Sequence, residues 1–209
     1  MIDARATTAA RTGIIGGLLF TVLNGMYVAS HGLDADPDHR VLLGLSQDAW
    51  AVVSFLAYPL LLFTYAHVVR TFWRSGTALS RAALALSAAS FVCVSVGHLL
   101  QLFGVTGAPG DAHVGFMGWM LYAVSLMVFG PATVLAAGLA WRRRGDHVPL
   151  RWPMLALGLA HGTVFLGAFD HDGGFEWVLP ALLLSGLAWM WVGLALLRRN
   201  SSPRFAVEA

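Results

Sequence analysis

Six long apolar stretches are the feature of this sequence that most constrains its fold. None has an arginine, aspartate or glutamate in its core, and each is close to or above the roughly 20 apolar residues that a membrane-crossing helix needs. Only 11% of the 209 residues are charged, whereas a soluble domain has about 25%. We therefore expect an all-α integral membrane bundle of six transmembrane helices that forms a single domain over residues 1–209. The predicted spans are Gly13–Ser30, Ala49–Val69, Ala82–Val105, Val114–Trp141, Pro153–Phe169 and Trp177–Leu197.

The charged residues sort to opposite sides of these spans. All 13 basic residues are arginines, and every one except Arg40 flanks the side on which both termini fall. Eight of the 11 carboxylates fall in the connections on the other side. The cytoplasmic connections of membrane proteins are enriched in arginine and lysine. The sequence therefore predicts cytoplasmic termini and a multi-pass protein of the cytoplasmic (inner) membrane. The positive net charge of +2 therefore comes from arginines that orient the helices in the membrane, and we expect no nucleic-acid partner.

Small residues and prolines recur inside the spans. Gly97 and Gly104 are seven residues apart on the third span and share a face, and Gly115 and Gly118 open the fourth. Small residues let membrane helices approach closely, so this pattern predicts tight packing. Pro59 removes a backbone donor inside the second span, which predicts a kink.

A small set of polar side chains falls inside the spans or at their outer ends. Such groups at membrane depth are functional-site candidates by default. At about 1.5 Å of rise per residue, most of them map to the outer half, where we expect them to converge on a pocket. The candidate catalytic carboxylates are Asp111, Asp170, Asp172 and Glu176. The residues expected to position or tune them are Asn24, His31, His98, Gln101, His113 and His161.

The segment from Asp170 to Glu176 is the densest polar run in the chain. Its three carboxylates repel one another, which raises the pKa of at least one of them. A carboxyl group that stays protonated at neutral pH is a competent general acid. Asp170 and Asp172 are therefore the preferred proton donors. The alternative interpretation is a solvated acidic turn that only follows the charge bias of the outer connections.

Aromatic residues map to the same outer half. An aromatic face stabilises a cation, and an apolar pocket with few polar groups suits a hydrophobic ligand. Membrane helices are also rich in aromatic residues without a functional reason. The expected pocket-lining residues are Tyr27, Tyr58, Trp119, Tyr122, Phe165 and Phe169.

Other site chemistries have less support in the sequence. The single cysteine, Cys93, lies between two valines without an obvious base, and the absence of lysine excludes Schiff-base chemistry. No His-Glu-x-x-His pattern occurs, so we expect no metal and no cofactor. Haem needs two histidines at matched depth, and pairing His98 with His31 or His113 leaves that alternative open.

A small, lysine-free, arginine-rich helical membrane protein with one acid cluster, Asp170–Glu176, resembles the small integral membrane terpene cyclases of bacterial pathways that make prenylated natural products. The resemblance implies a prenylated substrate, an acidic residue that protonates a terminal alkene or epoxide, and no metal. The expected function is therefore acid catalysis on a hydrophobic isoprenoid-type substrate by a cyclase, isomerase or lyase. The expected partners are that lipid-like small molecule and membrane lipid.

Two other classes stay open. A small transporter or a subunit of a membrane complex would use His98, Gln101 and His161 as a polar track. A haem- or copper-binding redox protein would use the histidines as ligands. The sequence leaves the oligomeric state open.

Overall fold

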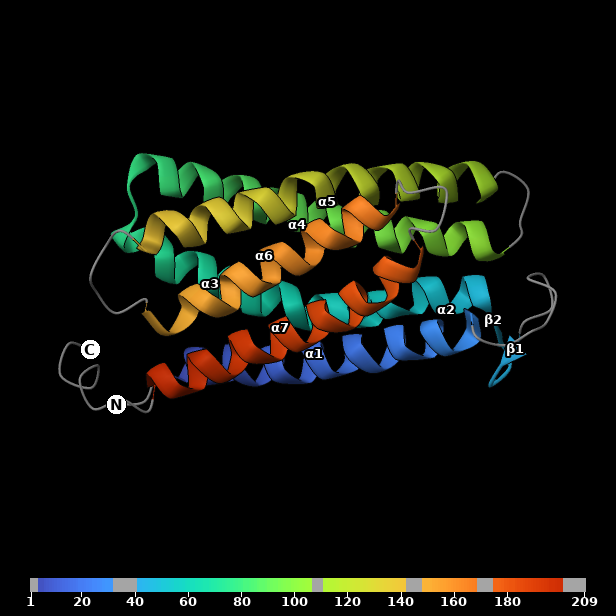
Figure 1. The fold of residues 1–209 in the computed structure, drawn as a ribbon, viewed down its shortest axis with the longest axis horizontal. Helices are drawn as coiled ribbons and strands as arrows, with labels where there is room; N and C mark the ends of the chain where they lie inside the picture. The colour runs from blue at the N-terminus through green and yellow to red at the C-terminus, as the bar shows by residue number, and fades with distance from the viewer. Residues whose placement is uncertain (1–3, 32–40, 107–110, 142–147, 169–174, 201–209) are drawn as a thin grey trace.

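The computed structural model describes residues 4–31, 41–106, 111–141, 148–168 and 175–200, and nearly all of them are helical. The prediction of a helical fold is therefore confirmed. In chain order the helices are α1 (Ala4–His31), α2 (Gln47–Val53), the 3-10 helix η2 (Ser54–Ala57), α3 (Tyr58–Ser75), α4 (Ala78–Thr106), α5 (Asp111–Trp141), α6 (Val148–Ala168) and α7 (Phe175–Asn200) (Figure 1).

A short antiparallel hairpin that the sequence analysis did not predict precedes α2. It pairs β1 (Val41–Leu42) with β2 (Leu45–Ser46). Its two central residues, Leu43 and Gly44, both have positive φ angles of 53° and 82°, as in the tight turns that match strand twist. The indole nitrogen of Trp50 donates a hydrogen bond to the Leu42 carbonyl at 2.8 Å, which ties the hairpin to α2.

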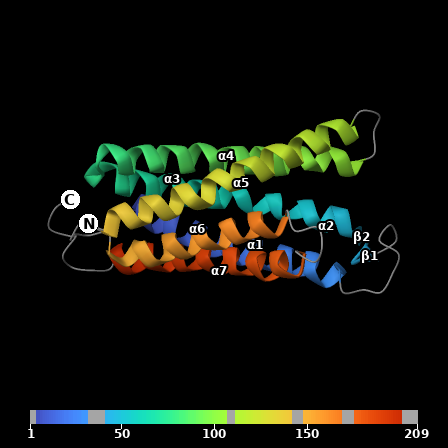
Figure 2. The ribbon, with the colours of Figure 1, turned by 45° about the horizontal axis from the view of Figure 1, so that its top comes forward.

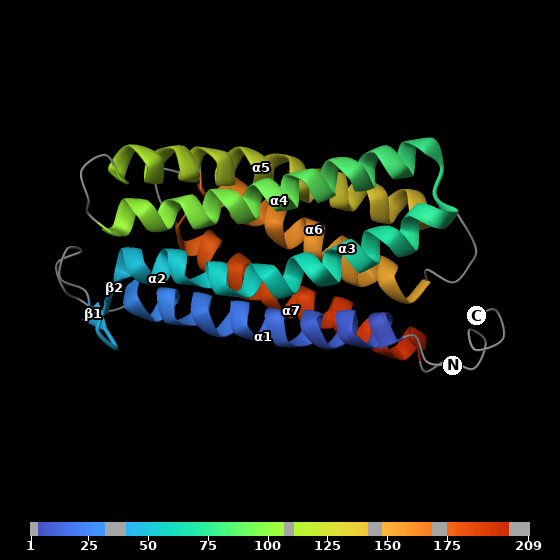
Figure 3. The ribbon, with the colours of Figure 1, turned by 180° about the vertical axis from the view of Figure 1, so that it is seen from behind.

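The second predicted span is interrupted next to Pro59, where the sequence predicts a kink. It consists of α2, η2 and α3 in succession, which Figure 3 shows as one long rod. Pro59, in the first turn of α3, has no N–H to donate to the Phe55 carbonyl, so the α-helical ladder is interrupted there. The chain takes the tighter 3-10 winding over this turn and then resumes as α3.

We call α1, the α2–η2–α3 segment, α4, α5, α6 and α7 the six rods. These rods form a closed ring. α1 packs against α7, α7 against α6, α6 against α5, α5 against α4, α4 against α3, and α3 against α1. In Figure 2, α4 and α5 lie on one side of the bundle, with α1, α6 and α7 on the other. The beginning of α1 and the end of α7 lie at the same end of the bundle (Figure 1). We call this the arginine end, because Arg11, Arg74 and Arg198 lie on helix segments there.

Five of the described helical spans are long and apolar enough to cross a membrane: Ala4–Ser30, Ser54–Arg74, Ala78–Gly104, Ala112–Leu139 and Pro180–Asn200. Large apolar side chains cover the outer surface of the bundle, for example Leu18, Leu86 and Leu184, which are at least 50% exposed. Such a surface indicates contact with lipid, because soluble proteins rarely expose large contiguous apolar patches. The chain therefore has the architecture of a multi-pass membrane protein.

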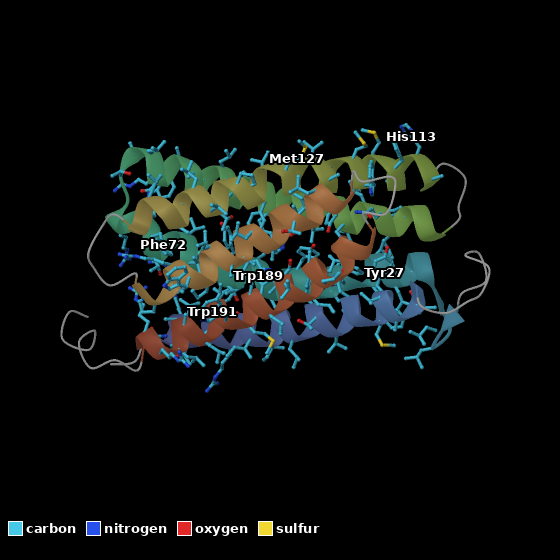
Figure 4. All side chains as sticks on the ribbon, in the orientation of Figure 1. Tyr27, Phe72, His113, Met127, Trp189 and Trp191 are labelled. Atoms are coloured by element: carbon cyan, nitrogen blue, oxygen red, sulfur yellow. The ribbon has the colours of Figure 1, made fainter. Side chains whose placement is uncertain are left out.

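The centre of the ring is filled with aromatic side chains from four rods. The rings of Phe91 and Phe129 stack with centroids 4.9 Å apart, and Phe91 lies 5.1 Å from Trp189. Tyr65 meets Phe129 and Trp189 edge-on at 5.5 Å and 5.8 Å. Figure 4 shows Trp189 in the middle of the bundle. We call these four residues the aromatic core.

Glycines set the closest helix approaches. A Cβ atom added to Gly17 of α1 would lie 2.7 Å from the Gly186 carbonyl oxygen of α7. One added to Gly97 of α4 would lie 2.8 Å from the Gly118 carbonyl oxygen of α5. At these crossings the backbones themselves are in contact, as expected where small residues drive membrane-helix packing.

The substitution Gly17→Ala tests this close packing. The added methyl group has no room between α1 and α7, so we expect a free energy of unfolding about 1–3 kcal/mol lower than that of Gly25→Ala. Gly25 is the matched control on the same helix, because its added Cβ would meet only the Leu183 side chain, at 3.9 Å. Unfolding in detergent, followed by circular dichroism, measures the difference, and equal stabilities contradict the packing.

Candidate functional site

A buried hydrogen bond between α4 and η2 is the centre of the candidate site. The Nε2 atom of His98 lies 3.0 Å from the Oγ atom of Ser54, and both side chains are buried. His98 lies two turns before the end of α4, at the end of the bundle opposite the arginine end. In a hydrophobic interior such a pair stabilises the fold only if both groups stay bonded.

Two tyrosines flank the His98 ring. The Tyr58 ring lies 5.3 Å from it, and the Tyr122 ring lies 5.1 Å from it at an angle of 62°. The hydroxyl groups of Tyr58 and Tyr122 also interact with each other. Phe20 of α1 meets Tyr58 edge-on at 5.9 Å and covers it from a fourth rod. We call Ser54, Tyr58, His98 and Tyr122 the polar network.

Local sequence places each member of the polar network. Ser54 begins the 3-10 turn and Tyr58 directly follows it, and both side chains contact His98. On the other side, the contact at Gly97 brings the α5 backbone against α4, because a Cβ at Gly97 would lie 2.6 Å from the Tyr122 nitrogen. The glycine contact therefore places Tyr122 beside His98.

Sequence reasoning identified three members of the polar network but missed Ser54. A lone serine in an apolar helix usually bonds its own backbone, as Ser90 does with the Leu86 carbonyl. The available signal in the sequence was its position in the turn that Pro59 disrupts, where a helix takes a different winding.

Asn24 and Gln101 are the nearest other predicted polar residues. Asn24 is buried and donates from Nδ2 to the Phe20 carbonyl at 2.8 Å, so its amide is used within α1. Gln101 is half-buried one turn beyond His98 on α4. Within the described part of the chain its buried Nε2 atom has no hydrogen-bond acceptor.

His161 lies apart from the polar network. Its Nδ1 atom donates to the Leu157 carbonyl at 3.0 Å, and its ring meets Phe129 edge-on at 5.0 Å and Trp189 at 6.4 Å. It therefore packs against the aromatic core. Among the described residues, neither its Nε2 atom nor the indole nitrogen of Trp189 has a hydrogen-bond partner.

Three other predicted residues lie at the periphery. His113 is exposed in the first turn of α5, as Figure 4 shows. Trp119 is 40% exposed and stacks on Phe116 at 6.2 Å on the outer face of α5, so it does not join the interior lining. Tyr27 is half-buried against the hydrophobic core.

The remaining predicted site residues lie outside the described part. For His31, Asp111, Phe165 and Glu176 the structure describes the helical backbone but not the side chain. Asp170, Asp172 and Phe169 lie wholly outside the described residues. The end of α6 and the beginning of α7 both lie in the half of the bundle where the polar network lies (Figure 1).

No protein-family model, no curated protein and no solved structure matches this chain. Across the described ranges, no three His, Cys, Asp or Glu side chains are grouped closely enough to hold a metal ion.

Replacing Ser54 with alanine tests the polar network. The change leaves the buried Nε2 atom of His98 without its hydroxyl partner, so we expect a loss of about 1 kcal/mol in the free energy of unfolding in detergent. Ser90→Ala is the control, because the Ser90 hydroxyl donates to the Leu86 carbonyl of its own helix, and we expect it to be nearly neutral. The nitrogen NMR signals of His98 should shift in Ser54→Ala alone; unshifted signals contradict the hydrogen bond.

Proposed function

We propose that all six rods cross the cytoplasmic membrane, with both termini and the arginine end in the cytoplasm. The one rod that is not among the five apolar spans given above is α6, which packs between α5 and α7 in the ring. Its 21 residues extend about 31 Å at 1.5 Å per residue, enough for a hydrocarbon core about 30 Å thick. The placement of twelve of the 13 arginines supports this orientation.

Cysteine labelling in intact cells tests the orientation. In a Cys93→Ser background, His113→Cys places a thiol at the exposed start of α5, and Ala78→Cys places one at the exposed start of α4, at the arginine end. A membrane-impermeant maleimide should label position 113 in intact cells and position 78 only after lysis. The reverse pattern contradicts the orientation.

We further propose that the outer half is the site of acid catalysis on a hydrophobic isoprenoid-type substrate. The observation that carries this proposal is the buried Ser54–His98 hydrogen bond, which joins two helices and lies between two tyrosine rings. Polar groups at membrane depth are costly and are typically functional. Asp170 and Asp172 are the proposed proton donors, because in the sequence they lie between the end of α6 and the beginning of α7, and both of these helix ends lie in this half of the bundle.

Each part of the polar network has a role in this chemistry. The half-buried ring of Tyr122 presents an electron-rich face that stabilises a carbocation formed by alkene protonation, while the buried Tyr58 ring packs against His98. The imidazole of His98, held by Ser54, offers a base that accepts a proton when the cation collapses to a new alkene. The substrate gains one proton at the alkene or epoxide and loses one from carbon, so the product is an isomer of the substrate.

Isotope incorporation tests the reaction. Membranes that contain the protein, incubated in D2O with prenylated aromatic substrates bearing a terminal alkene or epoxide, should form an isomeric product carrying one deuterium. We expect Asp170→Asn or Asp172→Asn to lower the rate by about 10²- to 10⁴-fold. Asp36→Asn, on the same side of the membrane in another connection, is the control and should retain the rate.

Two outcomes contradict the catalytic proposal. If the double variant Asp170→Asn/Asp172→Asn keeps the full rate, the acid assignment is wrong. If no prenylated substrate of the panel gives an isomeric product, the isoprenoid assignment is wrong.

A further inference from the structure

A groove on the outer surface between α3 and α4 is separate from the polar network. It has a volume of about 420 Å³ and lies toward the arginine end of the two helices. Figure 3 shows α3 and α4 side by side on the face turned to the viewer, joined by a short connection at that end. This face of the bundle is directed toward lipid in the proposed membrane arrangement.

The body of the groove is apolar. Leu62, Ala66 and Val69 recur along one face of α3, and Ala88 and Val92 form the opposite wall on α4. The small side chains of Ala66 and Ala88 leave the groove open, because larger side chains at these two positions would fill it. The buried Tyr65 lies at its floor, with its hydroxyl already bonded to Ser87 at 2.7 Å.

The end of the groove nearest the α3–α4 connection is strongly basic. Arg70 and Arg74 line it, and both side chains are exposed. Neither guanidinium forms a hydrogen bond or ion pair with any residue that the structure describes. Trp73, which lies between them in the sequence, also lines the groove, and its side chain is 42% exposed. Tryptophan favours such a position at a membrane interface.

The connection that frames the basic end is fixed by hydrogen bonds. The backbone nitrogen of Ser80 donates to the Thr77 hydroxyl at 3.2 Å, which caps α4. The Nε atom of Arg81 donates to the Trp73 carbonyl at 3.0 Å, which satisfies the end of α3. Arg81 is thus used by the fold, whereas Arg70 and Arg74 remain available to a ligand.

We infer that the groove binds an anionic glycerophospholipid of the leaflet at the arginine end. An acyl chain lies along the apolar walls, and Arg70 and Arg74 bind the phosphate group, since guanidinium pairs strongly with phosphate oxygens. The length fits: the twelve steps along α3 from Leu62 to Arg74 span about 18 Å, close to one half of a hydrocarbon core about 30 Å thick. The inference depends on membrane insertion but not on the chemistry proposed for the polar network.

Native mass spectrometry of the detergent-solubilised full chain, titrated with phosphatidylglycerol or phosphatidylcholine, tests the inference. We expect preferential binding of one phosphatidylglycerol. Arg70→Gln/Arg74→Gln should weaken that binding by about 30-fold, the effect of losing two exposed guanidinium–phosphate ion pairs at about 1 kcal/mol each. The control Arg5→Gln/Arg11→Gln removes the same charge from α1 at the same end and should leave the binding unchanged.

A second variant tests the apolar part of the groove. Ala66→Phe fills the hollow at an exposed position while both arginines stay in place, and it should abolish retention of the lipid. Equal binding of the two lipids, an equal loss in both arginine double variants, or unchanged binding in Ala66→Phe each overturns the inference. Displacement of the lipid by millimolar inorganic phosphate also overturns it, because the site would then recognise phosphate without an acyl chain.

Discussion

Backbone contact at glycines is the constraint on which the rest of the structure depends. In a membrane the lipid is as apolar as the helix surface, so helices associate through close packing rather than water exclusion. Gly17 with Gly186 joins the two ends of the chain, and Gly97 with Gly118 joins α4 to α5. The second contact also brings Tyr122 beside His98. Ring closure and the polar network therefore have the same physical origin.

The aromatic core separates two chemically different ends. On one side lies the polar network around His98, and on the other lie the exposed arginines of α3. Between them Tyr65 is fully bonded, to Ser87 at 2.7 Å and Thr133 at 3.2 Å. A carrier would need His98, Gln101 and His161 to form one track, but His161 packs against the aromatic core instead. The arrangement thus favours separate sites over a continuous path.

The sequence predicts the helices well and the directions of their side chains poorly. Low charge and long apolar runs are enough to predict the rods. A membrane helix, however, is apolar on both its lipid face and its interior face, so hydropathy does not distinguish Trp119, which faces outward, from Tyr122, which packs against His98. Ser54 was missed because its partner comes from another helix, and only the packing of α4 against η2 creates that pair.

Photo-crosslinking at Met190 tests ring closure most directly, because the contact of α1 with α7 joins the two ends of the chain. The Met190 side chain lies against Gly17, whose added Cβ would be 2.8 Å from the Met190 Cγ atom, whereas Met127 is 45% exposed on the outer face of α5 (Figure 4). With photo-methionine incorporated throughout, position 190 should crosslink to the α1 peptide around Gly17 within one molecule, and position 127 to lipid. Crosslinking of position 190 to lipid alone would contradict the closed ring.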